Sequence, residues 1–287
     1  IAADDNRVAL AGGTAAFASK DVGTHTVTSS GMTLAAGSSG DESDNYNLTT
    51  VATTTANITT KALTITDPLI ADRVYDGTTN PGALTIGTLS GFVSGETVTA
   101  NGSAANYSSK NLGVYTVDVT YTLADGTGGG LATNYSLAVG TASGNVTARP
   151  LTANSSIDSK VYDGTNVTGT INLGTVSNLV SNETLVITTT AAPYADKHVG
   201  TGKLTTITYS LANGDNGGLA SNYSMASIDV TGNITVRAIN VTAQSTSKTY
   251  DGVTSSLTAP LVDALQTGDV VSNAGIQTYA SKNVGTN

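Results

Sequence analysis

Apolar and polar residues alternate along several stretches of this chain. In residues 117–123 every second position is Val, Tyr or Leu, with Asp or Thr between them, and residues 207–211 repeat the pattern. Shorter alternating runs begin at Leu63, Leu151 and Ile239. A period of two indicates antiparallel strands with one face on a core and the other in water. The pattern therefore predicts an all-β protein.

Turn-forming residues separate these runs. Residues 124–130 and 213–218 are rich in Gly, Asp and Asn, which favour tight turns. We count six or seven strands per repeating segment, which predicts small two-layer β-sandwich domains, Ig-like in character. A short helix near residues 218–221 leaves a β-grasp-like variant open.

The strongest landmark is a Tyr-Asp-Gly tripeptide that returns after 87 and then 88 residues. Asp-Gly between β-prone runs is a tight-turn signal, and the Tyr ring suits a small core beside it. We interpret the tripeptide as a fold signature. Its residues are Tyr75, Asp76 and Gly77; Tyr162, Asp163 and Gly164; and Tyr250, Asp251 and Gly252.

Two further landmarks keep the same order in each repeat. One is an Asn-Tyr pair and the other is a block that begins with Lys and ends with Gly three residues later. These landmarks divide the chain into two complete repeats, 61–148 and 149–236, and two partial ones, 1–60 and 237–287. The pairs are Asn45-Tyr46, Asn134-Tyr135 and Asn222-Tyr223, and the blocks begin at Lys20, Lys110, Lys197 and Lys282.

A repeat of about 88 residues exceeds the 20–50 residues of a solenoid unit and matches a small domain. The apolar parity slips between Ile234 and Ile239, and again between Val146 and Leu151, with no Gly/Ser-rich linker. A one-residue slip turns the apolar set to the opposite face. We expect each strand to leave one core and feed the next directly, giving a stiff, extended rod. Because the sequence begins and ends inside a repeat, we also expect a longer tandem array.

Composition narrows the functional classes. The chain has 287 residues, a formal charge of −9, 11% charged residues and no Cys. An acidic, charge-poor surface argues against nucleic acids and anionic membranes as partners, and the absence of Cys excludes disulfides. No apolar run is long enough to span a bilayer as a helix. Neighbouring repeats, and other copies of the same fibre, are the expected partners.

Candidate chemistry is sparse. His25 and His198 stand apart from other metal ligands, and we interpret both as exposed loop residues. The recurring acid at Glu96, Glu183 and Asp269 has no second carboxylate at a fixed distance, so we expect no enzyme activity. No cofactor is predicted, although the acidic loops at Asp41–Asp44, Asp125 and Asp215 keep structural calcium open.

A covalent alternative concerns residues that recur together. Lys110, Asn134 and Glu96 return as Lys197, Asn222 and Glu183, which are the residue types of intramolecular Lys–Asn isopeptide bonds. Each such bond would release one ammonia. Simpler roles in turns and hydrogen bonding favour an unlinked chain.

Three segments together carry a family resemblance: Lys-Val-Tyr-Asp-Gly-Thr, Tyr-Ala-Asp-Lys-His-Val-Gly and Gly-Gly-Leu-Ala-Ser-Asn-Tyr-Ser. They resemble the YDG-type repeats, related to MBG repeats, of very large secreted bacterial adhesins such as filamentous-haemagglutinin-like proteins. The resemblance implies a stalk module exported to the bacterial cell surface for attachment, aggregation or biofilm formation. It carries over no catalytic residue. Val253 departs from the Thr that follows the other two signatures.

The main hypothesis is a structural stalk or fibre segment of a cell-surface adhesin. The alternative is that each repeat binds a ligand such as a glycan or a host protein. A flat exposed array of Thr, or a shared aromatic patch, would favour that alternative.

Overall fold

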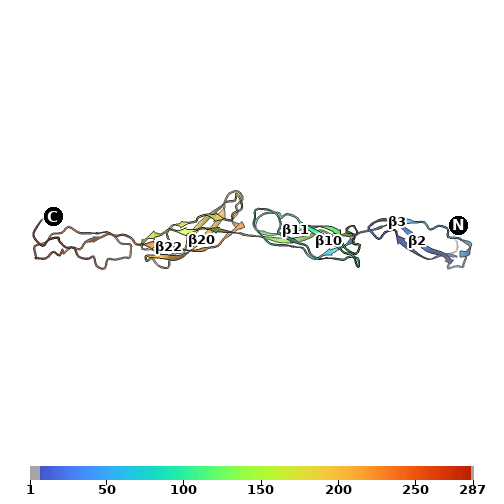
Figure 1. The fold of residues 1–287 in the computed structure, drawn as a ribbon, viewed down its shortest axis with the longest axis horizontal. Helices are drawn as coiled ribbons and strands as arrows, with labels where there is room; N and C mark the ends of the chain where they lie inside the picture. The colour runs from blue at the N-terminus through green and yellow to red at the C-terminus, as the bar shows by residue number, and fades with distance from the viewer. Residues whose placement is uncertain (1–6, 286–287) are drawn as a thin grey trace. The chain divides into compact units, whose positions relative to one another are not determined.

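The computed structural model describes residues 7–285; the first six residues of repeat 1–60 and the last two of repeat 237–287 lie outside that range. It contains 24 strands and three single-turn 3-10 helices, which confirms the all-β prediction (Figure 1). The chain divides into two units after Thr147. Among residues 7–285, no helix is long and apolar enough to cross a membrane.

The first unit begins with a three-stranded antiparallel sheet in the order β1-β2-β3. Gly12 and Gly13 in β1, and Gly31 in β2, have positive φ, which kinks this hairpin near its middle. Most of β1 is exposed, so this part of the chain has a thin core. The elements are β1 (Val8–Phe17), β2 (Gly23–Ala36), η1 (Ser43–Asn45) and β3 (Thr54–Ile58).

The rest of the first unit forms two layers. One layer is a four-stranded sheet in the order β10-β11-β13-β7, in which only the β13–β7 pair is parallel. The other layer consists of the short pairs β5–β9, β6–β8 and β4–β12. The elements are β4 (Lys61–Ala62), β5 (Thr64–Ile65), β6 (Leu69–Ile70), β7 (Arg73–Val74), β8 (Leu84–Thr85), β9 (Leu89–Ser90), β10 (Val98–Ala104), β11 (Gly113–Asp125), η2 (Ala132–Asn134), β12 (Tyr135–Ser136) and β13 (Gly140–Thr147).

The second unit repeats this plan. Its main sheet has the order β19-β20-β22-β16, opposite the sheets β18-β14-β21 and β15-β17. The helix expected near residues 218–221 is the single 3-10 turn η3. The elements are β14 (Arg149–Ala153), β15 (Ser156–Ile157), β16 (Lys160–Val161), β17 (Ile171–Asn172), β18 (Val176–Ser177), β19 (Leu185–Ala191), β20 (Gly200–Asn213), η3 (Ala220–Asn222), β21 (Tyr223–Met225), β22 (Ile228–Thr235), β23 (Val241–Thr242) and β24 (Leu261–Val262).

The alternating runs lie as predicted in the complete repeats. Val117 and Val119 in β11, and Ile207 in β20, are buried, whereas the Thr and Asp residues between the apolar positions of β11 are exposed. Leu63 and Leu151 at the starts of the repeats are also buried. The period-two pattern therefore identified the core faces of β11 and β20 correctly.

Glycine sets how closely the two layers approach. A Cβ at Gly144 in β13 would overlap Tyr107 Oη and Ile70, and a Cβ at Gly232 in β22 would overlap Tyr194 Oη. The two glycines occupy equivalent places in successive repeats. Each lets a buried tyrosine lie directly on the backbone of the central sheet.

The fourth repeat departs from the predicted pattern. The inward face expected from Ile239 is wrong, because Ile239 and Val241 are 46% and 59% exposed. In the third repeat the equivalent strand β14 pairs in parallel with β21, which begins at the Asn-Tyr landmark. Among the described residues of the fourth repeat no such strand follows, and β23 pairs only with β24. Alternation therefore does not lead to burial there.

Candidate functional site: the junctions between repeats

The Tyr-Asp-Gly signature forms a turn that is locked by its own carboxylate. Asp76 Oδ1 accepts hydrogen bonds from the backbone N and the hydroxyl of Thr78, both at 2.9 Å, and Gly77 has a φ of 82°. Arg73 Nη1 adds a 2.6 Å contact to the same oxygen. This is an Asx-type turn in which only Gly fits the left-handed position without strain.

The other two signatures form the same turn. Asp163 Oδ1 accepts from Thr165 N at 2.9 Å and from Lys160 Nζ at 2.8 Å, and Asp251 is bonded to Val253 N and Lys248 in the same way. Gly164 and Gly252 have φ values of 81° and 79°. The basic residue three positions before each Asp is thus part of the turn.

The signature tyrosine lies behind this turn. Tyr75 is fully buried and its backbone N donates to Thr147 O at 2.9 Å, which extends the β7–β13 pairing. Lys110 Nζ lies 5.8 Å from the centre of its ring, and Lys197 lies at the same distance from the ring of Tyr162. The Lys block and the signature are therefore joined by a cation–π contact in both complete repeats.

Within the first unit, the first repeat contacts the second through charge. Lys20 Nζ lies 2.6 Å from Glu96 Oε1, and Tyr135 Oη donates to Glu96 Oε2 at 2.7 Å. The Glu96 side chain is only 11% exposed, whereas that of Lys20 is 66% exposed. Glu96 thus accepts one bond from its own repeat and one from the repeat before it.

Asn134 completes this junction. Its Oδ1 accepts from Val22 N at 2.8 Å, and its Nδ2 donates to Asp21 Oδ1 at 2.9 Å. One amide therefore binds both the backbone and the carboxylate of the preceding Lys block. Asn134, from the Asn-Tyr pair of the second repeat, thus binds the Lys block of the first repeat.

Within the second unit, the same type of contact joins the third repeat to the fourth. Lys197 Nζ lies 3.1 Å from Asp269 Oδ1, and Tyr162 Oη donates to Asp269 Oδ2 at 2.7 Å. Asp269 is the counterpart of Glu96 in the sequence. At both described junctions the Lys of one repeat is therefore bound to the recurring acid of the next.

A small apolar hollow of about 290 Å³ lies beside this second contact, lined in part by Tyr162, Val199 and Ile239. With its amide oriented to satisfy its neighbours, Gln266 donates to Asp163 O at 2.9 Å and accepts from Arg237 Nη1 at 2.7 Å. The signature of the third repeat thus contacts the fourth repeat directly.

Hydrogen bonding sets the charge state of the junction acids. Bonds from Lys20 and Tyr135 lower the pKa of Glu96, and bonds from Tyr162 and Lys197 lower the pKa of Asp269. The bond to Glu96 in turn raises the pKa of Lys20. Both partners are therefore ionised at neutral pH, which is the state that favours the contact.

A comparison with protein-family models identifies the repeats. The model described as YDG domain matches residues 1–56, 59–143, 147–230 and 235–287. The chain belongs to the YDG domain family. No curated protein and no solved structure matches it. The signature turn and its junction contacts are therefore features of YDG domains in this chain.

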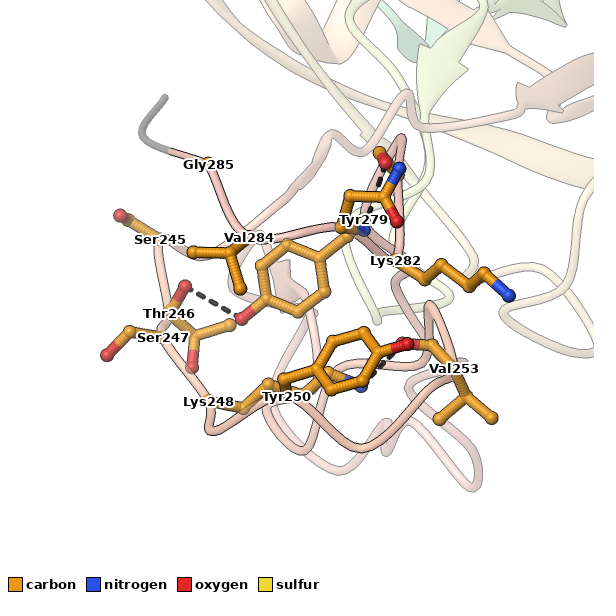
Figure 2. Close-up of a pocket in the computed structure, with 12 residues that line it drawn as sticks. Ser245, Thr246, Ser247, Lys248, Tyr250, Val253, Tyr279, Lys282, Val284 and Gly285 are labelled. Atoms are coloured by element: carbon orange, nitrogen blue, oxygen red, sulfur yellow. Dashed lines mark hydrogen bonds between the residues drawn. The ribbon is translucent and has the colours of Figure 1, made fainter.

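A groove with a volume of about 530 Å³ lies in the fourth YDG domain. Figure 2 shows Tyr250 and Tyr279 facing into it, with Tyr279 Oη donating to Thr246 O at 2.8 Å. Tyr250 is 59% exposed, unlike the fully buried Tyr75. In the second and third domains, β13 and β22 pair beside the residues that precede this tyrosine. Among the described residues of the fourth domain no equivalent of β13 or β22 is present, and the groove lies where that strand would pair. The shape of the groove therefore does not indicate a ligand site.

The two histidines differ from each other. His198 is an exposed loop residue, as interpreted, but the same interpretation of His25 is wrong. His25 lies within β2, is half-buried, and its Nε2 lies 2.7 Å from Asp21 O. In the next YDG domain the equivalent contact runs from Tyr115 Oη to Asn111 O. His25 therefore substitutes for a structural tyrosine beside the Lys block.

Carboxylates in the acidic loops stabilise turns by accepting hydrogen bonds. Asp41 Oδ1 accepts from the backbone N and hydroxyl of Ser43, and Asp125 Oδ1 accepts from Ala132 N at 2.7 Å. Among residues 7–285, no group of three or more acidic or His side chains is placed to hold a metal ion. Structural calcium, which the sequence left open without predicting it, has no located site among these residues.

The residue types considered for an isopeptide bond have other contacts. Glu96 binds Lys20 of the preceding domain, Asn134 binds Asp21 and Val22, and Lys110 lies over the ring of Tyr75. In the third domain, Glu183 accepts from Tyr223 Oη at 2.7 Å. Sequence reasoning grouped the recurring acid with the recurring Lys of the same repeat and did not pair it with the Lys of the repeat before. The recurrence of one Lys and one acid per repeat was the available signal, but it does not say which two repeats contribute the pair.

Proposed function

We propose that this chain is a structural stalk or fibre segment of a bacterial cell-surface adhesin, located outside the cell and without enzyme activity. In this role, tandem YDG domains hold a distant adhesive element away from the cell or contribute to attachment, aggregation or biofilm formation. The family match gives tandem YDG domains, and the proposal adds that these domains act as a spacer.

The observation that carries the proposal is the repeated contact across junctions. Lys20 binds Glu96 between the first and second domains, and Lys197 binds Asp269 between the third and fourth. A contact that uses one basic and one acidic residue per domain can be repeated along an array of any length. Such a series limits hinge motion between neighbours, and limited hinge motion is what a spacer requires.

Small-angle X-ray scattering on arrays of increasing length tests this proposal. Arrays are made by adding copies of residues 149–236, and the maximal dimension of each array is measured. A stiff spacer gains the same increment in length for every added domain. A dimension that grows only as the square root of the number of domains would indicate flexible beads and would contradict the proposal.

The ligand-binding alternative rests on a second observation. The outer face of the main sheets is rich in exposed hydroxyls, among them Thr116 and Thr120 in β11. Several of these hydroxyls bond to one another, as in the 2.7 Å contacts between Thr116 and Ser143 and between Thr190 and Thr208. Saturable binding of the chain on a glycan array would favour this alternative over a passive spacer.

A further inference from the structure

The chain contains three Asn-Gly pairs in different surroundings. Asn101-Gly102 lies within β10, Asn213-Gly214 at the end of β20, and Asn216-Gly217 inside the loop 213–218. In such a pair the backbone nitrogen after the Asn can reach the side-chain amide with little hindrance, because Gly has no side chain. The three pairs share this chemistry, so their surroundings decide which of them reacts.

The pair Asn216-Gly217 forms the tip of a tight turn. Asn216 has a φ of 57° and Gly217 a φ of 83°, and Gly218 N donates to Asp215 O at 3.1 Å. Two left-handed residues enclosed by such a bond define a type I′ turn, in which Asn-Gly is the preferred dipeptide. Both residues are exposed. The turn therefore presents the pair to water.

The two groups that would react in this pair have no hydrogen-bond partner. Among residues 7–285, neither the side-chain amide of Asn216 nor the backbone N–H of Gly217 takes part in a hydrogen bond. The neighbouring positions are held, because Gly214 N donates to Gly218 O at 3.0 Å and Asp215 N to Thr184 Oγ1 at 2.7 Å. No hydrogen bond has to open before the two groups of the pair can meet.

The other two pairs are held in place. Asn213 Oδ1 accepts from Ala220 N at 2.9 Å and Gly214 N donates to Gly218 O, so both reacting groups of that pair are bonded. Asn101 lies in an extended strand opposite Thr122 of β11. Ring closure at Asn101 would take the backbone of β10 out of this pairing. Both sites should therefore react slowly in the folded chain.

We propose that Asn216 is a site of self-modification, at which the side-chain amide is lost by reaction with the following backbone and water. Hydroxide removes the proton from Gly217 N, and this nitrogen attacks Cγ of Asn216. A C–N bond forms, the amide nitrogen of the side chain takes up a proton and leaves as ammonia, and a five-membered imide remains. Water then adds to one of the two imide carbonyls and breaks its bond to the nitrogen.

Two products result, and the net reaction consumes one water and releases one ammonia. Opening at Cγ gives an aspartate at position 216, whereas opening at the main-chain carbonyl gives an isoaspartate, whose backbone is longer by a methylene group. The longer backbone should break the bond between Gly218 N and Asp215 O. Either product adds one negative charge to the formal −9 of the chain.

The equivalent turn of the second domain cannot react in this way. There Gly128 and Gly129 have φ values of 65° and 81°, and Gly130 N donates to Thr127 O at 3.2 Å. The turn is the same, but it has no side-chain amide. This inference does not rest on the spacer function, because the reaction uses only the loop and water.

Peptide mapping of the full chain tests the proposal. The folded chain is incubated in mildly alkaline buffer made with ¹⁸O-labelled water, so that only sites modified during the incubation carry the label. After proteolysis, tandem mass spectrometry gives the rate at each Asn-Gly pair. Asn216 is expected to react about tenfold faster than Asn213, where two hydrogen bonds must open first. An equal or slower rate at Asn216 would overturn the proposal.

The same incubation in urea separates the effect of structure from that of sequence. In the unfolded chain the three pairs are expected to react at similar rates, because the dipeptide is the same and the hydrogen bonds are lost. If the preference for Asn216 over Asn213 were as large in urea as in the folded chain, the turn would not select the site.

Anion-exchange chromatography provides a measurement on the whole chain. Each modified molecule carries one more negative charge, so the folded wild-type chain should accumulate a later-eluting form. Asn216→Gly gives the third domain the Gly-Gly turn of the second and should remove most of this form. Asn101→Gln is the matched control, since it removes a different Asn-Gly pair and should leave the form unchanged. Accumulation that persists in Asn216→Gly, or that disappears in Asn101→Gln, would overturn the proposal.

Discussion

Lys20 Nζ and Glu96 Oε1 lie 2.6 Å apart although 76 positions separate them in the chain. The contact joins two YDG domains and is accompanied by the bond from Val22 N to Asn134 Oδ1. Together with the bond from Asn134 Nδ2 to Asp21 Oδ1, these two bonds link the Lys block of the first domain to the second domain. Their loss should be visible locally without unfolding either domain.

Lys20→Ala should therefore increase hydrogen exchange at the Val22 amide, because the neighbouring ion pair no longer holds the Lys block against Asn134. The core of the second domain, represented by Val119, should keep its protection. Residue-resolved exchange measured by NMR checks both expectations. Lys61→Ala is the matched control, since Lys61 is exposed in β4 and has no described ion pair. Unchanged exchange at Val22 in Lys20→Ala would show that the ion pair does not hold the junction.

Low pH should open the same junction. Hydrogen bonds from Lys20 and Tyr135 lower the pKa of Glu96 below its ordinary value of 4.5. A carboxyl group whose pKa is lower when the junction is formed stabilises it above pH 4.5, and this contribution is lost as pH falls through the lowered value. The protection factor of Val22, corrected for intrinsic exchange, should fall over that range. In Glu96→Gln the protection of Val22 should be weaker at neutral pH, and its pH step should shrink to the part that Asp21 contributes, because the bond from Asn134 lowers the pKa of Asp21 as well.

The sequence predicted the fold where strands are long. The alternation in residues 117–123 placed Val117 and Val119 in the core because side-chain direction in a strand is fixed by parity. The Asp-Gly turns were also predictable, since the left-handed φ of Gly77 is a local requirement. Strand faces and tight turns depend on residues close together in the chain, so they can be predicted from one sequence.

The junction contacts were not predictable in the same way. Lys20 and Glu96 come from different domains, so no local period relates them, and Tyr162 looked like a core residue until its hydroxyl was found on Asp269. The burial expected for Ile239 failed for a related reason. The side chain of Ile239 can be buried only if another strand packs beside it, and the alternation of apolar residues in 239–243 does not provide that strand.

The signature glycines Gly164 and Gly252 have similar left-handed φ values but differ in the space around them, so alanine at the two sites should cost different amounts of stability. Gly164→Ala and Gly252→Ala should each cost about 1–2 kcal/mol, because an L residue is strained at a φ near 80°. Gly164→Ala should cost more, since a Cβ there would lie 3.1 Å from Gln266 Cβ, whereas the space around Gly252 is open. Urea unfolding of each variant measures the loss. Gly285→Ala is the control, because that site has open space and no positive φ. Equal values for all three variants would remove the conformational role of the signature glycine.

Lys160, two residues before the signature Tyr162, should contribute to the low pKa of Asp163. A hydrogen bond from Lys160, followed by one from Thr165 N, lowers the pKa of Asp163 from 3.8 to about 2. Lys160→Ala should raise that pKa toward its ordinary value, and the carboxyl resonance of Asp163 in a ¹³C NMR titration reports it. Lys203→Ala is the control, because Lys203 pairs with Asp196 in the same domain. An Asp163 midpoint that stays near 2 in Lys160→Ala would assign the shift to the turn alone.

The two tyrosines Tyr75 and Tyr250 occupy the same place in the signature but differ in burial. Tyr75 is fully buried, and Tyr250 is 59% exposed. Tyr75→Ala should therefore reduce the stability of the second domain by about 3–5 kcal/mol, as expected for removing a buried aromatic side chain. Tyr250→Ala should change stability by no more than about 0.5 kcal/mol, as for most surface substitutions. Urea unfolding followed by amide exchange within each domain separates the two effects. If Tyr250→Ala cost as much as Tyr75→Ala, the fourth domain would have to bury its signature tyrosine in solution, and the signature would be a core element in every repeat.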